Sequence, residues 1–375
     1  MQKKGKSIEN KHIKICLVSL AFFPDKKDGS AKIATSIYNY LNNNGYNIKV
    51  ITAKWNIDLE DPNIIQINII RKRFFWFPQF ILNVFRILNK QKFDIIHGNG
   101  SRVNIPFLFR KYLTTIHDLG PFETSFSKIP ILPMLVKLNA FRAKKIITPS
   151  NIIRMGLKYY IRRLNIKKIK CVYNPIDPKF KPYPKQGISL KEKLNLKGPT
   201  ILYIGRVAFY KGIDDLIAAY HLVKKEISDL NLVIGGKPTL KMASIYQSWK
   251  EKYKDIKFVG MIPEEKIQYY YSMADVFVTY SNASEGFGLT PIESIACGTP
   301  VICSNLPAYR EILGNNAIFV PPKEPELLAE KIKYYFEKEE IKKNLINKSQ
   351  DLIKKYSMES FGKNLIDIYQ EFLKI

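Results

Sequence analysis

Two carboxylates, Glu285 and Glu293, stand eight positions apart around a glycine-rich turn. Gly286-Phe287-Gly288 lies between them, and the second carboxylate falls in the helix-like run 291–296. A loop that leads into a helix N-terminus offers free backbone N–H groups and a positive dipole end, which suit a phosphate. Carboxylates on each side can accept hydrogen bonds from sugar hydroxyls. This stretch therefore predicts a site for a nucleotide sugar, although Glu293 alone could equally cap a helix.

A second charged motif, GRVAFYKG at 205–212, follows a strand-like run and precedes a helix predicted over 213–226. Arg206 can hold phosphate oxygens with its planar fork, and Lys211 adds a mobile point charge. Two cations beside a diphosphate would stabilise the charge that develops on a departing nucleotide. Two solvated cations in a surface loop would give the same pattern, so this motif alone leaves both interpretations open.

Strand-like apolar runs alternate with helix-like segments along almost the whole chain, which indicates parallel sheets joined by crossover helices. The first half contains runs at 13–19, 48–52, 64–69, 94–97, 113–116, 145–148 and 170–173. The second half contains runs at 200–204, 230–234, 256–259, 276–279, 301–303 and 317–320. We therefore predict an α/β protein with two Rossmann-like, doubly wound domains that face each other across a cleft.

A proline-rich polar stretch between the two sets of strands predicts an interdomain linker. It reads Asn-Pro-Ile-Asp-Pro at 174–178 and is followed by Pro182 and Pro184. We predict one domain over 1–180 and a second over 181–352. Residues 353–375 are predicted to form a helical segment that packs back towards the first domain.

The second half resembles the donor domain of the family 4 (group 1) glycosyltransferases. The resemblance rests on GRVAFYKG, 232–236, Phe258-Val259-Gly260, 273–276, EGFGLTPIE at 285–293, ACGTPV at 296–301 and LPAYRE at 306–311, all in the family's order. The first half is similar more loosely. The resemblance implies a GT-B fold, in which the domain over 1–180 binds the acceptor and the domain over 181–352 binds the donor. It also implies retention of anomeric configuration and no need for a metal or other cofactor.

The resemblance also implies roles for individual residues. Arg206 and Lys211 would bind the donor diphosphate, Glu285 the donor sugar, and Glu293 the ribose hydroxyls. The donor-binding residues would further include Phe287, Gly288, Leu289 and Thr290 in the turn, and Gly260 and Met261 beside the base.

In the first half, His117 matches the family's histidine beside the reaction centre. His117 ends a strand-like run, where a doubly wound domain presents its ligand contacts, although an ordinary polar strand end would look the same. Gly29 follows the first strand, where the family usually has a glycine pair; here Ser30 replaces the second glycine. We predict that Gly29 lies at the site and that His97 is structural.

The positive charge of the chain is concentrated in its first half. Residues 1–180 hold 32 Lys/Arg against 10 Asp/Glu, while residues 181–375 hold 28 against 23. Such a domain favours an anionic partner, namely phospholipid head groups, a lipid-linked phosphate or nucleic acid. A lysine-rich composition without function is the plain alternative, and no zinc-finger, RRM-type or helix-turn-helix pattern supports nucleic acid.

Basic and aromatic residues meet at 71–77 (RKRFFWF), a pattern that suits a membrane interface. The alternative is a loop that leads into a core-packing helix. We predict surface contact for 71–77 and core packing for the apolar positions that follow, Phe80, Ile81, Val84, Phe85, Ile87 and Leu88.

The composition places the chain among folded globular proteins, with 46% hydrophobic residues. The apolar runs are too short to cross a bilayer, and the first of them lacks a cleavage site. The four cysteines show no CxxC pairing, so we expect buried, reduced thiols in the cytoplasm. We therefore predict a cytoplasmic protein that lies peripherally on the cytosolic face of the membrane.

Three functions from different classes follow from these patterns. The first is transfer of a hexose from a UDP- or GDP-linked sugar to an oligosaccharide or lipid-linked acceptor at an anionic membrane surface. The second is a GT-B enzyme that remodels the nucleotide sugar itself, such as an epimerase. The third is a basic nucleic-acid-binding protein, which the charge alone suggests.

Overall fold

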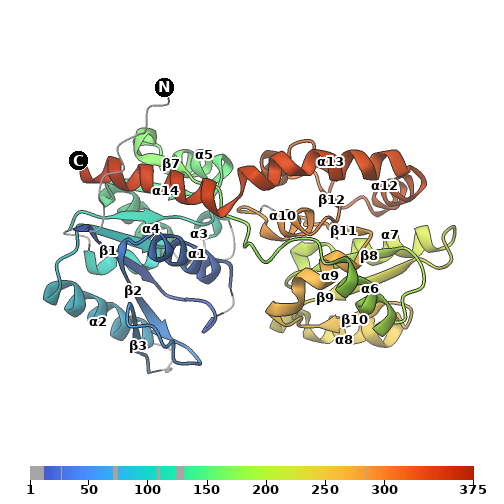
Figure 1. Cartoon of the computed structure of the whole chain (residues 1–375), viewed down its shortest axis with the longest axis horizontal. Helices are drawn as coiled ribbons and strands as arrows, with labels where there is room; N and C mark the ends of the chain where they lie inside the picture. Colours follow the sequence, from blue (N-terminus) through green and yellow to red (C-terminus); the bar gives the residue numbers. More distant parts are fainter. Residues whose placement is uncertain (1–11, 27, 71–74, 108–109, 124–130, 284) are drawn as a thin grey trace. The chain divides into compact units, whose positions relative to one another are not determined.

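Apolar and β-branched runs form the strands of two separate parallel sheets (Figure 1). The computed structural model describes residues 12–26, 28–70, 75–107, 110–123, 131–283 and 285–375. The chain divides into an N-terminal unit, residues 1–175 with 358–375, and a C-terminal unit, residues 176–357.

The N-terminal unit carries a seven-stranded sheet with the strand order β3-β2-β1-β4-β5-β6-β7. All its strand pairs are parallel. Its elements are β1 (Lys14–Ser19), α1 (Gly29–Asn43), β2 (Asn47–Lys54), β3 (Ile64–Asn68), α2 (Trp76–Lys90), β4 (Ile95–Asn99), the 3₁₀ helix η2 (Ser101–Phe107), β5 (Leu113–Thr115), α3 (Gly120–Glu123), α4 (Ile131–Arg142), β6 (Lys145–Thr148), α5 (Asn151–Tyr160), η4 (Ile166–Lys168), β7 (Ile169–Cys171) and α14 (Met358–Leu373).

The C-terminal unit carries a six-stranded parallel sheet with the order β10-β9-β8-β11-β12-β13. Its elements are α6 (Pro184–Lys193), β8 (Thr200–Ile204), η5 (Phe209–Lys211), α7 (Ile213–Lys224), β9 (Asn231–Gly235), η6 (Leu240–Met242), α8 (Ala243–Lys252), β10 (Lys257–Gly260), η7 (Glu264–Lys266), α9 (Ile267–Met273), β11 (Val276–Thr279), α10 (Leu289–Ala296), β12 (Val301–Ser304), α11 (Pro307–Leu313), β13 (Ala317–Val320), α12 (Pro325–Glu337) and α13 (Glu339–Lys355).

Helices cover the N-terminal sheet with two distinct cores. One core contains buried residues of α2, α4 and α5, such as Phe80, Val136 and Leu157. The other contains residues of α1 and α14. Because α4 and α5 follow consecutive strands and share one core, they lie on the same side of the sheet. That side therefore presents the outer surfaces of both helices to its surroundings.

The C-terminal helix α14 is part of the N-terminal unit. Tyr369 on α14 contacts Nδ1 of His97 at 2.8 Å, and Thr115 contacts the other ring nitrogen at 2.8 Å. Burial lowers the pKa of His97 to about 3, so the ring is neutral at pH 7. The helix approaches α1 closely at Gly362, where a Cβ would lie 2.0 Å from the Tyr40 ring. His97 is therefore structural, as predicted.

The sequence predictions for the fold are largely confirmed. Every predicted strand is present, with bounds that move by one or two residues, and the fold class is α/β with two Rossmann-like units. Residues 172–183, all described, contain turns but no strand or helix, as expected of a linker. The contact boundaries fall after Pro175 and Ser357, beside the predicted boundaries after residues 180 and 352.

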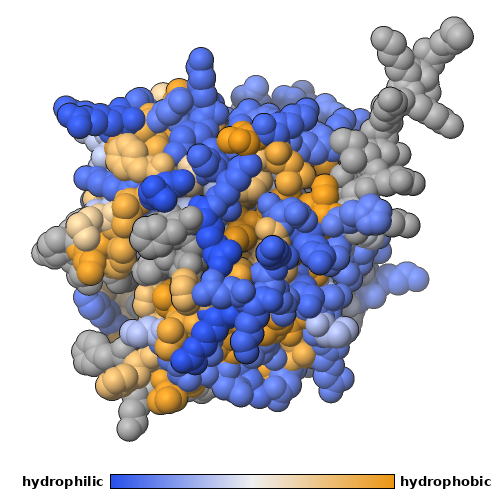
Figure 2. Space-filling model, turned by 90° about the vertical axis from the view of Figure 1, so that its left-hand side faces the viewer, coloured by the Kyte–Doolittle hydropathy of each residue, from blue (hydrophilic) through white to orange (hydrophobic). Residues whose placement is uncertain are grey.

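One core prediction for α2 is wrong. Phe80, Val84 and Leu88 are buried at helical spacing, but Phe85 is 45% exposed because it lies on the outward face of the helix. Residues 71–74 of the basic aromatic stretch lie outside the described residues. Figure 2 shows one face of the molecule on which hydrophobic groups stand among hydrophilic ones.

The four cysteines are free thiols. Cys16, Cys297 and Cys303 are buried, as predicted, and burial raises the pKa of each thiol far above its ordinary value. Cys171 departs from the prediction because it is only half-buried. Across the described residues, no helix is both long enough and apolar enough to span a bilayer.

The His97–Tyr369 contact gives a first prediction. Tyr369→Phe leaves a buried ring nitrogen without its hydroxyl partner, so the free energy of unfolding of the N-terminal unit should fall by about 1–3 kcal/mol. Urea unfolding followed by tryptophan fluorescence measures this in a Trp249→Phe background, where the two remaining tryptophans, Trp55 and Trp76, both lie in this unit. Tyr159→Phe, at a well exposed position, is the control. Equal stability of both variants would contradict the role of the contact.

Candidate active site

The strand order of each sheet reverses once, and most of the predicted site residues lie beside these reversal points. In the C-terminal unit the reversal separates β8 from β11, and in the N-terminal unit it separates β1 from β4. Crossover connections leave in opposite directions there, and ligands of open α/β sheets generally bind beyond the carboxyl ends of such strands.

The loop after β8 has a fixed backbone. Val207 is buried, its N–H donates to the Lys237 carbonyl at 3.1 Å, and the Tyr203 hydroxyl donates to the Arg206 carbonyl at 2.9 Å. The Arg206 side chain itself is exposed. The loop ends at Gly212, which has a φ of 56°. A Cβ at this position would lie 2.1 Å from the Tyr280 carbonyl oxygen, so both the backbone conformation and the close approach require glycine.

Lys211 and Glu285 form an ion pair through Nζ and Oε1. Each side chain is only 15% exposed, and the Ser281 hydroxyl donates to the same carboxylate oxygen at 2.7 Å. Lys211 ends the loop after β8, and Glu285 lies in the loop after β11. The structure therefore brings together two of the predicted catalytic residues, which are 74 positions apart in the sequence.

Helix α10 begins beside this ion pair in the sequence. Its N-cap is Gly288, with a φ of 84°, and a Cβ there would lie 2.6 Å from the Tyr309 ring. Phe287 is buried and its ring packs edge-on against Tyr356 at 5.7 Å. Leu289 and Thr290 are the first two helical residues. The first N–H groups of a helix have no carbonyl partner within it, so this turn can offer them to an anion.

Glu293 lies inside α10 and is 6% exposed. The hydroxyl of Tyr271 on α9 donates to its Oε2 at 3.0 Å. Burial and the neighbouring Glu293 carboxylate raise the pKa of Tyr271 well above its usual range, so the tyrosine remains a donor. Thr299 in turn donates to the Tyr271 carbonyl at 2.6 Å. Tyr271 is thus a positioning residue that sequence reasoning missed.

Gly260 and Met261 lie at the end of β10, the edge strand, which β9 separates from β8. Gly260 has a φ of 68°, and its carbonyl accepts from the Gly236 N–H at 2.7 Å. Met261 is exposed, whereas the next residue, Ile262, is buried. The predicted base-binding residues therefore lie at the carboxyl end of the same sheet, but on a strand that is farther from β11 than β8 is.

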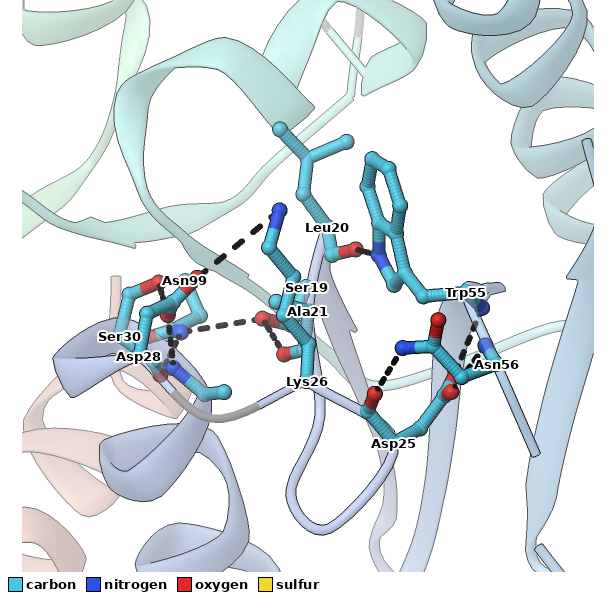
Figure 3. A network of polar contacts seen from close by, with 11 residues as sticks. Ser19, Leu20, Ala21, Asp25, Lys26, Asp28, Ser30, Trp55, Asn56 and Asn99 are labelled. Carbon is cyan, nitrogen blue, oxygen red and sulfur yellow. Dashed lines mark hydrogen bonds and ion pairs between the residues drawn. The ribbon is translucent and has the colours of Figure 1, made fainter. Parts of the chain in front are cut away.

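In the N-terminal unit, Asn99 connects the ends of three strands. It ends β4, and its Nδ2 donates to Ser19 Oγ at 3.1 Å and to the Ser30 carbonyl at 2.9 Å (Figure 3). Its Oδ1 contacts Nε2 of His117 at 2.8 Å. Sequence reasoning missed Asn99, although a polar residue that closes a strand next to the first strand is the signal that could have found it.

This contact determines the tautomer of His117. The Ser30 carbonyl can only accept, so the amide nitrogen of Asn99 faces it and the amide oxygen faces His117. An amide oxygen also only accepts, so Nε2 of His117 carries the proton and Nδ1 of the neutral ring is the acceptor. Burial lowers the pKa of His117 to about 4, against the opposing effects of Asp118 and Asp28, so the ring is neutral at pH 7.

Gly29 opens α1 directly after the capping residue Asp28, whose Oδ1 accepts from Ser30 Oγ at 2.7 Å and from the Ala31 N–H at 2.9 Å. A Cβ at Gly29 would meet nothing within 4 Å, so neighbouring protein atoms do not require the glycine. Its place at the site stays a prediction.

The structure places Arg206, Lys211, Glu285 and the α10 turn in one unit, and His117 and Gly29 in the other. In the ranges that the structure describes, no group of three His, Cys, Asp or Glu side chains is spaced to hold a metal ion. The independence from metal remains a prediction.

Solved structures share this architecture. The sucrose-phosphate synthase from Thermosynechococcus elongatus has a TM-score of 0.81 at 21% identity, over 96% of this chain and 99% of that one. The Anabaena protein HepE, solved with UDP and glucose, has a TM-score of 0.79 at 17% identity, over 96% and 100%. Together with the two Rossmann-like units, these likenesses define a GT-B fold.

Sequence comparison identifies the family. The model described as "Glycosyl transferases group 1" matches residues 185–352, and that of "Glycosyltransferase Family 4" matches 27–180. A glycosyltransferase of Methanocaldococcus jannaschii is 25% identical over 96% of this chain and 98% of its own length. The O-antigen chain mannosyltransferase RfbU of Salmonella typhimurium is 31% identical over 57% and 58%. The chain belongs to the group 1, family 4 glycosyltransferases and is an enzyme of that class.

The Lys211–Glu285 pair gives a second prediction. Lys211→Met or Glu285→Gln each leaves a charge that is largely buried without its partner, so each should lower the stability of the C-terminal unit by about 1–3 kcal/mol. The double variant should lose less than the sum of the two single losses, because it leaves no unpaired charge. Thermal or urea unfolding of the four proteins measures the coupling. Strictly additive losses would contradict the ion pair.

The Asn99–His117 contact gives a third prediction. Asn99→Asp places a carboxylate beside Nε2, which favours the imidazolium, so the pKa of His117 should rise from about 4 to its ordinary value or above. Imidazole NMR resolves this, because the chain has four histidines. Asn165→Asp, at an exposed position, is the control and should leave the pKa unchanged. An unchanged pKa in Asn99→Asp would refute the contact between Asn99 and His117.

Proposed function

We propose that this glycosyltransferase moves a hexose from a nucleoside diphosphate sugar to a membrane-associated saccharide or lipid-linked acceptor. The donor is UDP- or GDP-linked, the anomeric configuration is retained, and no metal or other cofactor takes part. The observation that carries the proposal is the cluster at the reversal point of the C-terminal sheet, where an ion pair, an exposed arginine side chain and a glycine-capped helix N-terminus come from adjoining loops.

Each part of the cluster suits one part of the donor. The α10 N-terminus and the Arg206 guanidinium are donors for the diphosphate, and Lys211 adds a cation that Glu285 and Ser281 hold in place. Glu285 accepts from sugar hydroxyls. Glu293, fixed by Tyr271, accepts from the ribose.

The proposed reaction uses these charges rather than a protein nucleophile. The bond between the anomeric carbon and the phosphate oxygen breaks, and the acceptor hydroxyl attacks from the same face. The acceptor proton passes to the leaving phosphate oxygen. Arg206 and Lys211 stabilise the negative charge on that phosphate as it departs. The neutral His117, with Nδ1 as acceptor, positions a hydroxyl of the reacting sugars.

The names of family relatives support both the hexose transfer and the saccharide or lipid-linked acceptor of this proposal. Their names include an O-antigen chain mannosyltransferase and an alpha-monoglucosyldiacylglycerol synthase, which is 32% identical over 45% of this chain. One of these names refers to a saccharide chain and the other to a glycolipid. The strongly basic N-terminal half also favours an anionic acceptor or membrane.

The proposal gives a fourth prediction. Arg206→Gln should weaken nucleoside diphosphate binding at least about tenfold, because it removes charge-assisted hydrogen bonds to the phosphates. It should not affect folding, because the side chain is exposed. Glu285→Gln should keep nucleotide binding but lower turnover about 100-fold or more, because it loses an acceptor for the sugar. A thermal-shift screen over UDP, GDP and their sugars measures binding. Release of nucleoside diphosphate in the presence of a lipid extract measures turnover.

Glu340→Gln, at an exposed position on α13, is the matched control and should behave as the wild type. EDTA should leave turnover unchanged. Full turnover by Glu285→Gln would disprove the proposed role of Glu285 in binding the sugar. A new nucleotide sugar formed without any acceptor would instead identify an enzyme that remodels its donor.

A further inference from the structure

Helix α4 (Ile131–Arg142) is apolar on two opposite faces. Its inner face buries Val136 and Ala140 against the sheet. Its outer face carries Ile131, Met134, Leu138 and Phe141, which are 55%, 58%, 41% and 47% exposed. A helix that is apolar all round is normally covered on every side, so this outer face indicates a partner that is itself apolar.

The four outer residues form one continuous stripe. They are spaced at i, i+3, i+7 and i+10, so at 100° per residue they fall within an arc of roughly 80°. Lys137 and Arg142 project on the two sides of this arc. The neighbouring helix α5 adds exposed Met155 and Tyr159, one turn apart. We call these six apolar residues the α4–α5 surface.

The segment that forms this surface is basic, although two of its cations, Lys145 and Lys170, pair with Glu371 of α14. Residues 131–170, which include both helices, contain eleven Lys/Arg and no Asp or Glu. Lys137, Lys144, Arg162, Arg163 and Lys167 among them are exposed. Lys168 reaches back to the Phe141 carbonyl at 2.8 Å, so the segment after α5 stays next to the end of α4. Cations therefore border the apolar stripe.

We infer that the α4–α5 surface docks the N-terminal unit onto a membrane that contains anionic lipid. Exposed Ile, Leu, Met and Phe suit the boundary between head groups and acyl chains, while the bordering Lys and Arg reach lipid phosphates. A second copy of this chain is a poor occupant, because like-charged residues would face each other. The inference deepens the proposed function, since it names where the chain meets a lipid-borne acceptor.

Flotation with lipid vesicles tests this inference with the full chain. The wild type should float with vesicles of 70% phosphatidylcholine and 30% phosphatidylglycerol, and added salt should weaken binding. Met134→Ser/Leu138→Ser/Phe141→Ser should lose at least tenfold in affinity at every salt concentration. Lys137→Gln/Lys144→Gln/Lys167→Gln should lose as much at low salt and show a smaller salt dependence. Vesicles of phosphatidylcholine alone should bind the wild type weakly.

Ile188→Ser/Leu240→Ser is the matched control, because both side chains are exposed apolar residues of the C-terminal unit. It should bind as the wild type. Circular dichroism and nucleotide thermal shifts show that each variant is folded, and they test the donor site independently of lipid. Equal flotation of the serine triple variant and the wild type overturns the inference. So does tighter binding to duplex DNA than to vesicles, or a dimer in ultracentrifugation that the same variant abolishes.

Discussion

The parallel pairing of β8 with β11 is the constraint on which the candidate donor site depends. It places the loops after these two strands at one edge of the sheet, and Lys211 can then reach Glu285 across 74 positions of sequence. Gly212 and Gly288 permit the close turns that each loop needs. The same pairing logic operates in the N-terminal sheet, where β1 and β4 adjoin and Asn99 joins their ends. Both units thus use one topological feature to gather polar groups.

The two units place their charges differently. In the C-terminal unit, Lys211 is largely buried and its charge is balanced by Glu285. In the N-terminal unit, His97 and His117 are neutral because burial lowers the pKa of each ring. Exposed cations such as Lys137, Lys144 and Arg162 lie at the surface of the same unit. A buried cation that is already paired binds a ligand selectively, because the ligand must interact with the cation more favourably than its carboxylate partner does. Uncompensated surface cations attract any extended anionic surface.

The sequence predicts the fold well because each strand is a short apolar run between polar segments, a local signal. It also predicts which loops matter, since GRVAFYKG and EGFGLTPIE carry recognisable residues. It does not predict which side chains meet. Tyr271–Glu293 and Asn99–His117 are tertiary contacts across 22 and 18 positions, and no local pattern encodes them. Phe85 was wrongly predicted as core because apolar residues occur on both faces of α2.

In the proposed reaction, the Lys211–Glu285 pair would also constrain how a diphosphate sugar binds. A phosphate that approaches Lys211 would share the ammonium group with the Glu285 carboxylate, because the ammonium has three N–H donors. The two anions would repel each other less if one of them gained another hydrogen-bond donor. A sugar hydroxyl is such a donor for Glu285. The sugar and the diphosphate would then bind cooperatively. The sugar hydroxyl would donate to Glu285 in place of part of the Lys211 ammonium, which could then donate to the phosphate. A nucleoside diphosphate without its sugar would still compete with the Glu285 carboxylate for Lys211. The Lys211–Glu285 pair would therefore favour binding of the nucleoside diphosphate sugar over binding of the nucleoside diphosphate product.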